Sequence, residues 1–340
     1  MSCYTYYDYW TISKYNPYKK ENNCHKCKII IKCQPGPTRT TSSIPITCDI
    51  YVTNRGDSTV SVIDGTTNSV INTIPVGIAP NGMETNHNTK LIYISNEFSN
   101  TVSVIDGNTN TVIATIPVGK HPVKIAINLN TNLIYTTNTG DNTVSVIDGN
   151  TNTVVATIPV GNEPFGISTN PNTNLIYIAH QASNTVSVIN GATNSVITTI
   201  PVRNNPRIPS VNPDTNLIYV PNTNDNTVSV IDGNTNSVVA TVPVGPSPES
   251  VSINPNTNLI YVPNGGNNTV SVINGTTNSV IATIPVGSFP TDINVDPNNC
   301  LIYVTNGIDD TVSVIDGATN TVINTIPVGD TPFGVSLLFS

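Results

Sequence analysis

The sequence predicts an all-β chain that forms a seven-bladed β-propeller. A 42-residue segment occurs seven times without insertion or deletion, which is the signature of a repeat architecture. The segment after the last repeat also matches a strand that the first repeat lacks, so the array is expected to close on itself. A motif tyrosine marks the register at Tyr51, Tyr93, Tyr135, Tyr177, Tyr219, Tyr261 and Tyr303.

Each repeat contains four short segments with the pattern of antiparallel strands. The first two, LIYVTN and TVSVID in the last repeat, alternate large apolar with small polar residues, as half-buried strands do. The third, TVINTIP, ends in a proline that has no N–H to donate, so it is expected at a sheet edge. The fourth segment follows the motif VGxxP, which comes directly after the third segment. In the DGxTN turn between the second and third strands, Asp is expected to cap the backbone and Gly to supply a positive φ. Four such strands are typical of a propeller blade.

The two ends of the repeat array predict how the ring closes. Before Tyr51 there is no copy of the strand that follows VGxxP, only a linker rich in Thr, Ser and Pro. The C-terminal sequence TPFGVSLLFS matches that missing strand. We therefore expect the C-terminal strand to join the N-terminal blade, which leaves no open repeat. The chain divides into a Cys- and Tyr-rich basic arm with a linker at 1–47, expected to be partly disordered, and the propeller at 48–340.

Charge is distributed unevenly along the chain. Residues 1–48 hold seven Lys or Arg and two carboxylates, net +5, which leaves −13 for the rest of a chain whose total is −8. An acidic propeller is a poor partner for a phosphate backbone, so no nucleic-acid binding is expected. No apolar run is long enough for a signal peptide or a membrane span, so no membrane insertion is expected. A cell, spore or particle surface is the predicted location, with the cytoplasm as the alternative.

The motifs IYVTN, TVSVIDG and TIPVG, recurring in phase over about residues 49–340, resemble those of the YVTN-repeat β-propellers. That family includes surface-layer proteins and related propellers, so the resemblance implies a surface or binding protein. The fold also resembles that of lactonases and of some cofactor-bearing reductase domains, which makes an enzyme the alternative by analogy.

The seven copies differ mainly in two loops, VGxxP and the loop after LIYVTN, which a propeller places on one face. The DGxTN turns of the opposite face hardly vary. Unlike residues on a rigid frame are typical of a binding surface, and neutral drift is the alternative explanation. Six variable residues head the inner strands near the channel: Lys124, Phe165, Arg207, Glu249, Asp292 and Phe333. The candidate binding residues are Glu97, Phe98, Lys120, His121, Lys124, Glu163, Phe165, Arg203, Arg207, Glu249, Phe289 and Asp292.

Five of the six cysteines precede or begin the first repeat: Cys3, Cys24, Cys27, Cys33 and Cys48. Together with the arm's tyrosines they favour disulfide cross-linking between copies, and hence self-assembly. Zinc binding by Cys24, Cys27 and Cys33 with Cys3 or His25 is one alternative, and free thiols are another. Cys48 and Cys300 occupy equivalent positions in neighbouring blades, but packed sheets lie too far apart for an obvious bridge, so that pairing stays open.

Catalytic and metal-binding patterns are scarce. The histidines His25, His87, His121 and His180 show no zinc-ligand spacing, although His121 and His180 share the variable face. Calcium is a weak alternative, because Asn224 to Asn226 and Asp309 with Asp310 offer oxygens without an EF-hand spacing. No cofactor is therefore predicted.

We predict that the chain is not an enzyme but a structural or binding module. An enzyme needs one asymmetric group of residues, whereas these copies are nearly identical. The module would be anchored through the cysteine-rich arm and would present its variable face to a protein or surface-polymer partner. The alternative is a lactonase-like enzyme with a site at the channel mouth, formed by His121, Lys124, Glu163, Arg207, Glu249 and Asp292.

Overall fold

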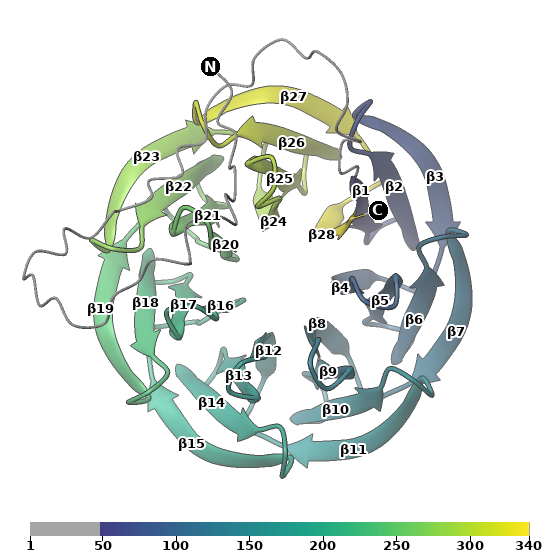
Figure 1. Ribbon diagram of the computed structural model, residues 1–340, viewed down its shortest axis with the longest axis vertical. Coiled ribbons are helices and arrows are strands. Elements are labelled where there is room, and N and C mark those ends of the chain that lie inside the picture. The colour runs from purple at the N-terminus through teal and green to yellow at the C-terminus, as the bar shows by residue number, and fades with distance from the viewer. Residues whose placement is uncertain (1–47, 340) are drawn as a thin grey trace, which may run out of the picture.

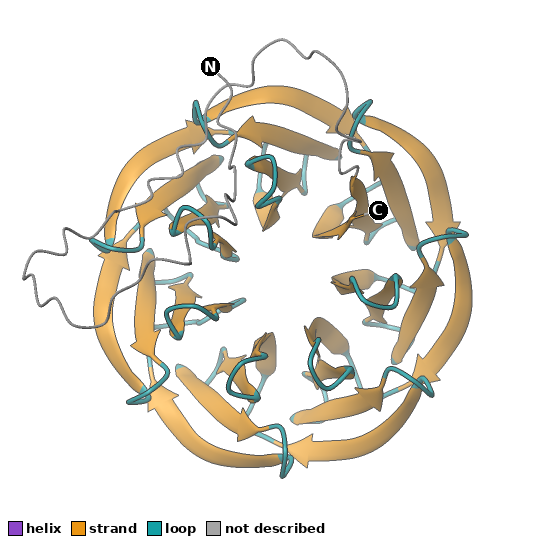
Figure 2. Ribbon diagram, viewed as in Figure 1, coloured by secondary structure: helices purple, strands orange, loops and turns teal. Residues whose placement is uncertain are grey.

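The computed structural model describes residues 48–339 and shows seven four-stranded antiparallel sheets around a central channel (Figure 1). The described residues form strands and loops and no helix (Figure 2). Among them, therefore, nothing has the form of a membrane-spanning helix. The predicted seven-bladed propeller is confirmed.

Each blade has, from the channel outward, one strand beside the channel, two middle strands and one outer strand. Blade 1 consists of β28 (Pro332–Phe339), β1 (Cys48–Asn54), β2 (Thr59–Asp64) and β3 (Ser69–Pro75). Blade 2 consists of β4 (Pro80–Asn86), β5 (Leu91–Asn96), β6 (Thr101–Asp106) and β7 (Thr111–Pro117). Blade 3 consists of β8 (Pro122–Asn128), β9 (Leu133–Asn138), β10 (Thr143–Asp148) and β11 (Thr153–Pro159). Blade 4 consists of β12 (Pro164–Asn170), β13 (Leu175–His180), β14 (Thr185–Asn190) and β15 (Ser195–Pro201). Blade 5 consists of β16 (Ser210–Asn212), β17 (Leu217–Asn222), β18 (Thr227–Asp232) and β19 (Ser237–Pro243). Blade 6 consists of β20 (Ser252–Asn254), β21 (Leu259–Asn264), β22 (Thr269–Asn274) and β23 (Ser279–Pro285). Blade 7 consists of β24 (Pro290–Val295), β25 (Leu301–Asn306), β26 (Thr311–Asp316) and β27 (Thr321–Pro327).

The core lies between adjacent blades. Tyr51 of blade 1, for example, packs with Ile92, Ile94 and Ile105 of blade 2. The seven motif tyrosines are among the largest fully buried side chains. A buried hydroxyl needs a partner, and that of Tyr93 donates to Asn152 Oδ1 in a turn of the next blade at 3.0 Å. The repeat therefore encodes contacts between blades as well as the blade itself.

The C-terminal strand closes the ring as predicted. β28 pairs antiparallel with β1, and Tyr51 lies opposite Ser336 in the register. Figure 1 shows β28 between β1 and the channel, where the other blades have their first strand in chain order.

The DGxTN turns confirm one prediction and correct another. Asp64 Oδ1 accepts the Thr66 N–H at 2.7 Å, which is the expected capping bond. The glycines, however, do not supply the positive φ, since no described glycine has one. The turn's asparagine does so instead, as at Asn110 with φ 53°, because Asn tolerates the left-handed region. Glycine is needed because a neighbouring side chain approaches the turn's backbone closely: a Cβ at Gly149 would lie 2.5 Å from Asn132 Oδ1.

One blade replaces the last motif asparagine with His180. In the regular blades this Asn ties strands together, as Asn96 does by donating to Thr101 Oγ1 at 3.1 Å and Ser103 Oγ at 2.9 Å. His180 is fully buried, and its Nε2 lies 2.9 Å from Ser187 Oγ. It is therefore a structural residue and does not converge with the exposed His121.

Restoring the motif with His180→Asn is expected to remove a pH dependence of stability. Burial lowers the pKa of His180 below its ordinary 6.5, so below that pH the unfolded chain binds a proton that the folded chain does not. The stability advantage of the variant should therefore grow as the pH falls below about 6.5. Thermal unfolding of the wild type and His180→Asn, measured at pH values above and below about 6.5, tests this prediction. His121→Asn, a substitution of an exposed histidine, is the control. An advantage that is the same at every pH would contradict the prediction.

Candidate active site

The central channel contains a cavity of about 370 Å³, lined by residues of the strands nearest the axis. At one end it is bounded by Lys124 and Asp292. Its opposite rim includes Leu129, Pro171 and Pro255, which lie in the Asn-rich turns of the face away from the VGxxP loops. A cavity of this size suits a small molecule.

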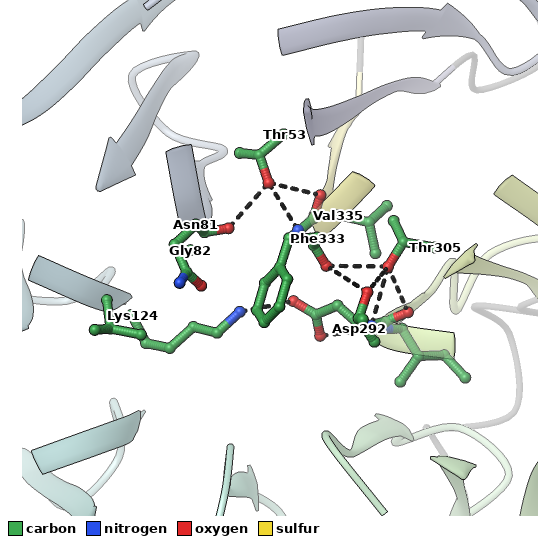
Figure 3. A network of polar contacts seen from close by, with 12 residues as sticks. Thr53, Asn81, Gly82, Lys124, Asp292, Thr305, Phe333 and Val335 are labelled. Atoms are coloured by element: carbon green, nitrogen blue, oxygen red, sulfur yellow. Dashed lines mark hydrogen bonds and ion pairs between the residues drawn. The ribbon is translucent and has the colours of Figure 1, made fainter. Parts of the chain in front are cut away.

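Lys124 and Asp292 come from opposite sides of the ring, in β8 and β24. Lys124 is 3% exposed, and its Nζ lies 3.4 Å from Asp292 Oδ2. The same ammonium lies 4.6 Å from the ring centroid of Phe333 in β28, and Figure 3 shows it extending toward that ring. Burial of an ion pair is costly unless both partners are held, so the pair needs support from the backbone around it.

Hydroxyl groups in the LIYVTN strands provide that support. Thr305 Oγ1 accepts the Asp292 N–H at 3.0 Å and donates to the Phe333 carbonyl at 3.0 Å (Figure 3). Thr137 Oγ1 accepts the Lys124 N–H at 3.2 Å and donates to the Phe165 carbonyl at 2.8 Å. Each hydroxyl thus fixes the channel strand of its own blade against that of the next.

Arg207 and Glu249 form a second ion pair, with Arg207 Nε 3.4 Å from Glu249 Oε2. They stand just before β16 and β20, which have only three residues each. In these two blades Pro221 and Pro263 replace the hydroxyl residue, and proline offers neither a hydroxyl nor an N–H. The proline carbonyls instead accept the N–H groups of Arg207 and Glu249, at 2.9 and 3.1 Å. The channel strand of blade 6 therefore begins only at Ser252. The Arg207 guanidinium also lies 4.7 Å from the Phe165 ring centroid.

Glu84 is the channel residue that sequence reasoning missed. It lines the cavity from β4 together with Lys124 and Asp292. Equivalent positions in five other blades hold Ser168, Ser210, Ser252, Asn294 and Ser336, and blade 3 has Ala126. Comparing the copies at this position alone would have found Glu84, because it is the one large charged side chain in a row of small ones.

The channel alters the ionisation of its residues. Burial raises the pKa of Glu84 to about 7, and the Asp292 charge adds to this, while the Thr85 N–H bond opposes it. Burial likewise lowers the pKa of Lys124 and raises that of Glu249, and their opposite charges work against both shifts. A carboxyl with a pKa of about 7 that lines the same cavity as a lysine is suited to accept and return a proton.

The other predicted residues lie away from the channel cavity, on the loop face. Glu97 pairs with Arg55 at 2.9 Å, and Phe98 contacts both Arg55 and His121. His121 and Glu163 line a separate surface pocket. Lys120, Arg203 and Phe289 are exposed. The residues predicted at the channel mouth therefore fall into two groups. Lys124, Arg207, Glu249 and Asp292 converge at the channel, whereas His121 and Glu163 do not join them.

The structure describes only some of the residues named in the cysteine and metal predictions. Cys3, Cys24, Cys27 and Cys33 lie outside the described residues. Cys48 is a free thiol, 4% exposed in β1, so it forms no bridge to Cys300. Burial raises its pKa to about 12, which leaves it inert as a thiolate nucleophile. Within residues 48–339 no group of three or more His, Cys, Asp or Glu side chains is placed to hold a metal ion.

Residues 88–195 match the model of a family described as "Lactonase, 7-bladed beta-propeller". This segment is less than half of the chain and includes Lys124. The match contradicts the prediction that the chain is not an enzyme. That prediction relied on near-identical copies, but some of the residues in which the copies differ, among them Glu84, Lys124 and Asp292, line the channel cavity. No curated protein matches the chain.

Solved structures confirm the fold. A protein of unknown function from Desulfotomaculum acetoxidans superimposes with a TM-score of 0.77 at 15% identity, over 85% of this chain and 98% of that one. Hydrazine synthase of Kuenenia stuttgartiensis gives 0.72 at 20% identity, over 78% and 91%. Dihydro-heme d1 dehydrogenase NirN gives 0.63 at 16% identity, over 86% and 66%. The resemblance to YVTN-repeat propellers and the surface location stay predictions.

Proposed function

We propose that the chain is a lactonase-like hydrolase whose active site is the channel cavity. One observation carries the proposal: five ionisable residues, each from a different blade, converge on the channel of an otherwise repetitive molecule. They are Glu84, Lys124, Arg207, Glu249 and Asp292. The lactonase model match over residues 88–195 supports the reaction class.

In the proposed reaction Glu84 acts as general base. Its carboxylate takes a proton from a water molecule, whose oxygen forms a bond to the lactone carbonyl carbon. The ring C–O bond then breaks, and the proton passes to the released alkoxide oxygen, which gives a hydroxy acid. A pKa of about 7 suits both the acceptance and the return of this proton.

Lys124 would stabilise the negative charge that develops on the carbonyl oxygen. It is buried, aligned by Asp292 and Phe333, and lines the same cavity as Glu84. Charge stabilisation by a fixed group in a water-poor site is usually the largest contribution to this kind of catalysis. Arg207 and Glu249 neutralise each other and limit the charge of the channel.

A variant at Lys124 tests the proposal. Lys124→Met is combined with Asp292→Asn, so that no unpaired carboxylate is left buried. Because a charge-stabilising group is lost, kcat for hydrolysis of γ-butyrolactone or δ-valerolactone should fall on the order of a hundredfold or more. Acid release in a pH-stat measures the rate.

Lys120→Met is the matched control, because Lys120 is an exposed lysine on a neighbouring loop, and it should hydrolyse at the wild-type rate. Absence of lactone hydrolysis by the wild-type chain, or equal rates for the double variant and the control, would contradict the proposed function.

A further inference from the structure

Cys300 stands at a position where the regular blades have an asparagine. In those blades the asparagine ties one blade to the next, as Asn132 Oδ1 does by accepting from Asn86 Nδ2 at 2.7 Å. Cys300 replaces this oxygen with sulfur, and Asn254 Nδ2 lies 4.0 Å from its Sγ. Sulfur is a weak acceptor, so the replacement weakens a hydrogen bond between blades. Contact between blades therefore does not explain why blade 7 has a cysteine here.

The bonding of the described cysteines shows where the partner of Cys300 belongs. Cys300 is disulfide-bonded, whereas Cys48, the other cysteine within residues 48–339, is a free thiol. The sulfur bonded to Cys300 therefore lies outside the described residues. The sequence has four cysteines there, all of them before β1: Cys3, Cys24, Cys27 and Cys33. The bond of Cys300 thus points to the N-terminal arm, residues 1–47.

Residues 1–47 join the propeller on the face that carries Cys300. We call this the turn face, because it is formed by the DGxTN turns and by the Asn-rich turns that follow the channel strands. Cys48 begins β1 on this face, and Cys300 immediately precedes β25. The carbonyl of each cysteine accepts the N–H of the glycine in the DGxTN turn of its blade, at 3.0 and 2.9 Å. Leu301 also packs against the core cluster that contains Cys48, so the arm joins the propeller close to Cys300.

The arm is long enough to reach Cys300 of its own chain. Its last cysteine, Cys33, precedes Cys48 by 48 − 33 = 15 positions, which span up to about 50 Å when extended. Packed sheets such as those of neighbouring blades lie about 10 Å apart. Two sulfurs on one chain have an effective concentration on the order of millimolar, above that of a second copy in solution. The chain's own arm is therefore favoured over that of another copy.

Charge also favours contact between the arm and the turn face. Residues 1–47 hold seven Lys or Arg and two carboxylates, 7 − 2 = +5. Six aspartates lie half-buried or exposed in the turns of this face: Asp64, Asp106, Asp148, Asp214, Asp232 and Asp316. Among residues 48–339 these turns hold one lysine, Lys90, whose ammonium already donates to the Phe339 carbonyl. The loop face is acidic as well, so charge permits the contact and Cys300 selects the face.

We propose that residues 1–47 bind across the turn face of their own propeller and are fixed there by a disulfide between Cys300 and a cysteine of the arm. The bond forms by exchange with a small-molecule disulfide. One cysteine thiolate attacks that disulfide and releases a first thiol, and the second cysteine thiolate then attacks the mixed disulfide and releases another. The two cysteines are oxidised while one small disulfide is reduced to two thiols. The inference does not depend on the proposed hydrolysis.

Peptide mapping of the full chain, equilibrated with oxidised and reduced glutathione, tests the bond. Free thiols are blocked, and the chain is digested with trypsin and Asp-N without reductant. Residues 296–308, which contain Cys300, should be recovered joined to an arm peptide, and the undigested protein should sediment as a monomer. Recovery of this peptide with a blocked thiol, with glutathione attached, or from a covalent dimer would overturn the inference.

Charge variants test the contact itself. Asp64→Asn combined with Asp316→Asn removes the carboxylates from the two turns that are bonded to Cys48 and Cys300. Asparagine fits there, because blades 4 and 6 have Asn190 and Asn274 at this position. The equilibrium constant for forming the disulfide from glutathione disulfide should fall about threefold to tenfold at low ionic strength, because attraction to the basic arm is lost. The difference should vanish in about 1 M salt, where exposed charges are screened.

Two controls separate this contact from misfolding. Asp141→Asn combined with Asp225→Asn makes the same charge change on the loop face, where blade 6 has Asn267, and should leave the constant unchanged. Cys300→Asn gives blade 7 the regular residue and should fold. Trypsin should cleave the arm of this variant about tenfold faster than that of the oxidised wild type, because cleavage requires release of the segment. Equal constants for the turn-face and loop-face variants, or equal cleavage rates, would show that the arm does not bind the turn face.

Discussion

Replacing Glu84 with glutamine is expected to lower kcat for lactone hydrolysis on the order of a thousandfold, because a positioned general base typically contributes about that much. The wild-type rate should rise with pH and level off above about 7, since only the deprotonated carboxyl can take a proton from water. Below that pH the rate of hydrolysis should fall about tenfold for each pH unit. Rate profiles of both proteins, measured by pH-stat on the same lactone, test the prediction.

The stability of Glu84→Gln shows whether lost activity reflects misfolding. The folded-state pKa of about 7 lies above the ordinary 4.5, so between these values the folded chain holds a proton that the unfolded chain releases. The wild type should therefore lose stability relative to the variant as pH rises from about 4.5 to about 7. Glu163→Gln, a substitution on an exposed loop, should change neither the rate of hydrolysis nor the pH dependence of stability. Full activity in Glu84→Gln would exclude Glu84 as the base.

Truncating the chain after Gly329 is expected to destroy the folded monomer. The deletion removes β28, and with it the buried side chains of Val335, Leu337 and Leu338. Their burial contributes about 2 kcal/mol each, and the deletion also leaves the inner edge of β1 unpaired. Together these losses approach the whole stability of an ordinary domain, about 5–15 kcal/mol. Sedimentation and thermal unfolding would detect aggregation or loss of the cooperative transition.

Two further measurements distinguish ring closure from a general intolerance of truncation. A synthetic peptide of residues 330–340 added to the truncated chain should restore a cooperative transition, because it can pair with β1. Leu338→Ala in the full chain should fold but lose about 2–5 kcal/mol, the usual cost of a cavity in a core. A truncated monomer as heat-resistant as the full chain would show that β28 does not close the ring.

Comparison of the seven copies predicted part of the candidate site. Lys124, Arg207, Glu249 and Asp292 were found because each breaks a repeating pattern at the start of a channel strand. Glu84 was not predicted because it lies farther along β4, away from the loops and strand starts in which the other deviations from the repeat occur. Conversely, His121 and His180 share a face by sequence, yet one is exposed and the other is buried as a substitute for a structural asparagine.

The number of blades, the four strands of each blade and the closure by the last strand could all be predicted from the sequence alone. These features depend on local pattern and on a fixed period, both of which are visible along the chain. Which unlike residues meet depends instead on the closed ring. Lys124 and Asp292 are 168 positions apart and face each other only because the ring brings opposite blades to one axis. The pKa of Glu84 likewise depends on burial within that ring, which no local pattern contains.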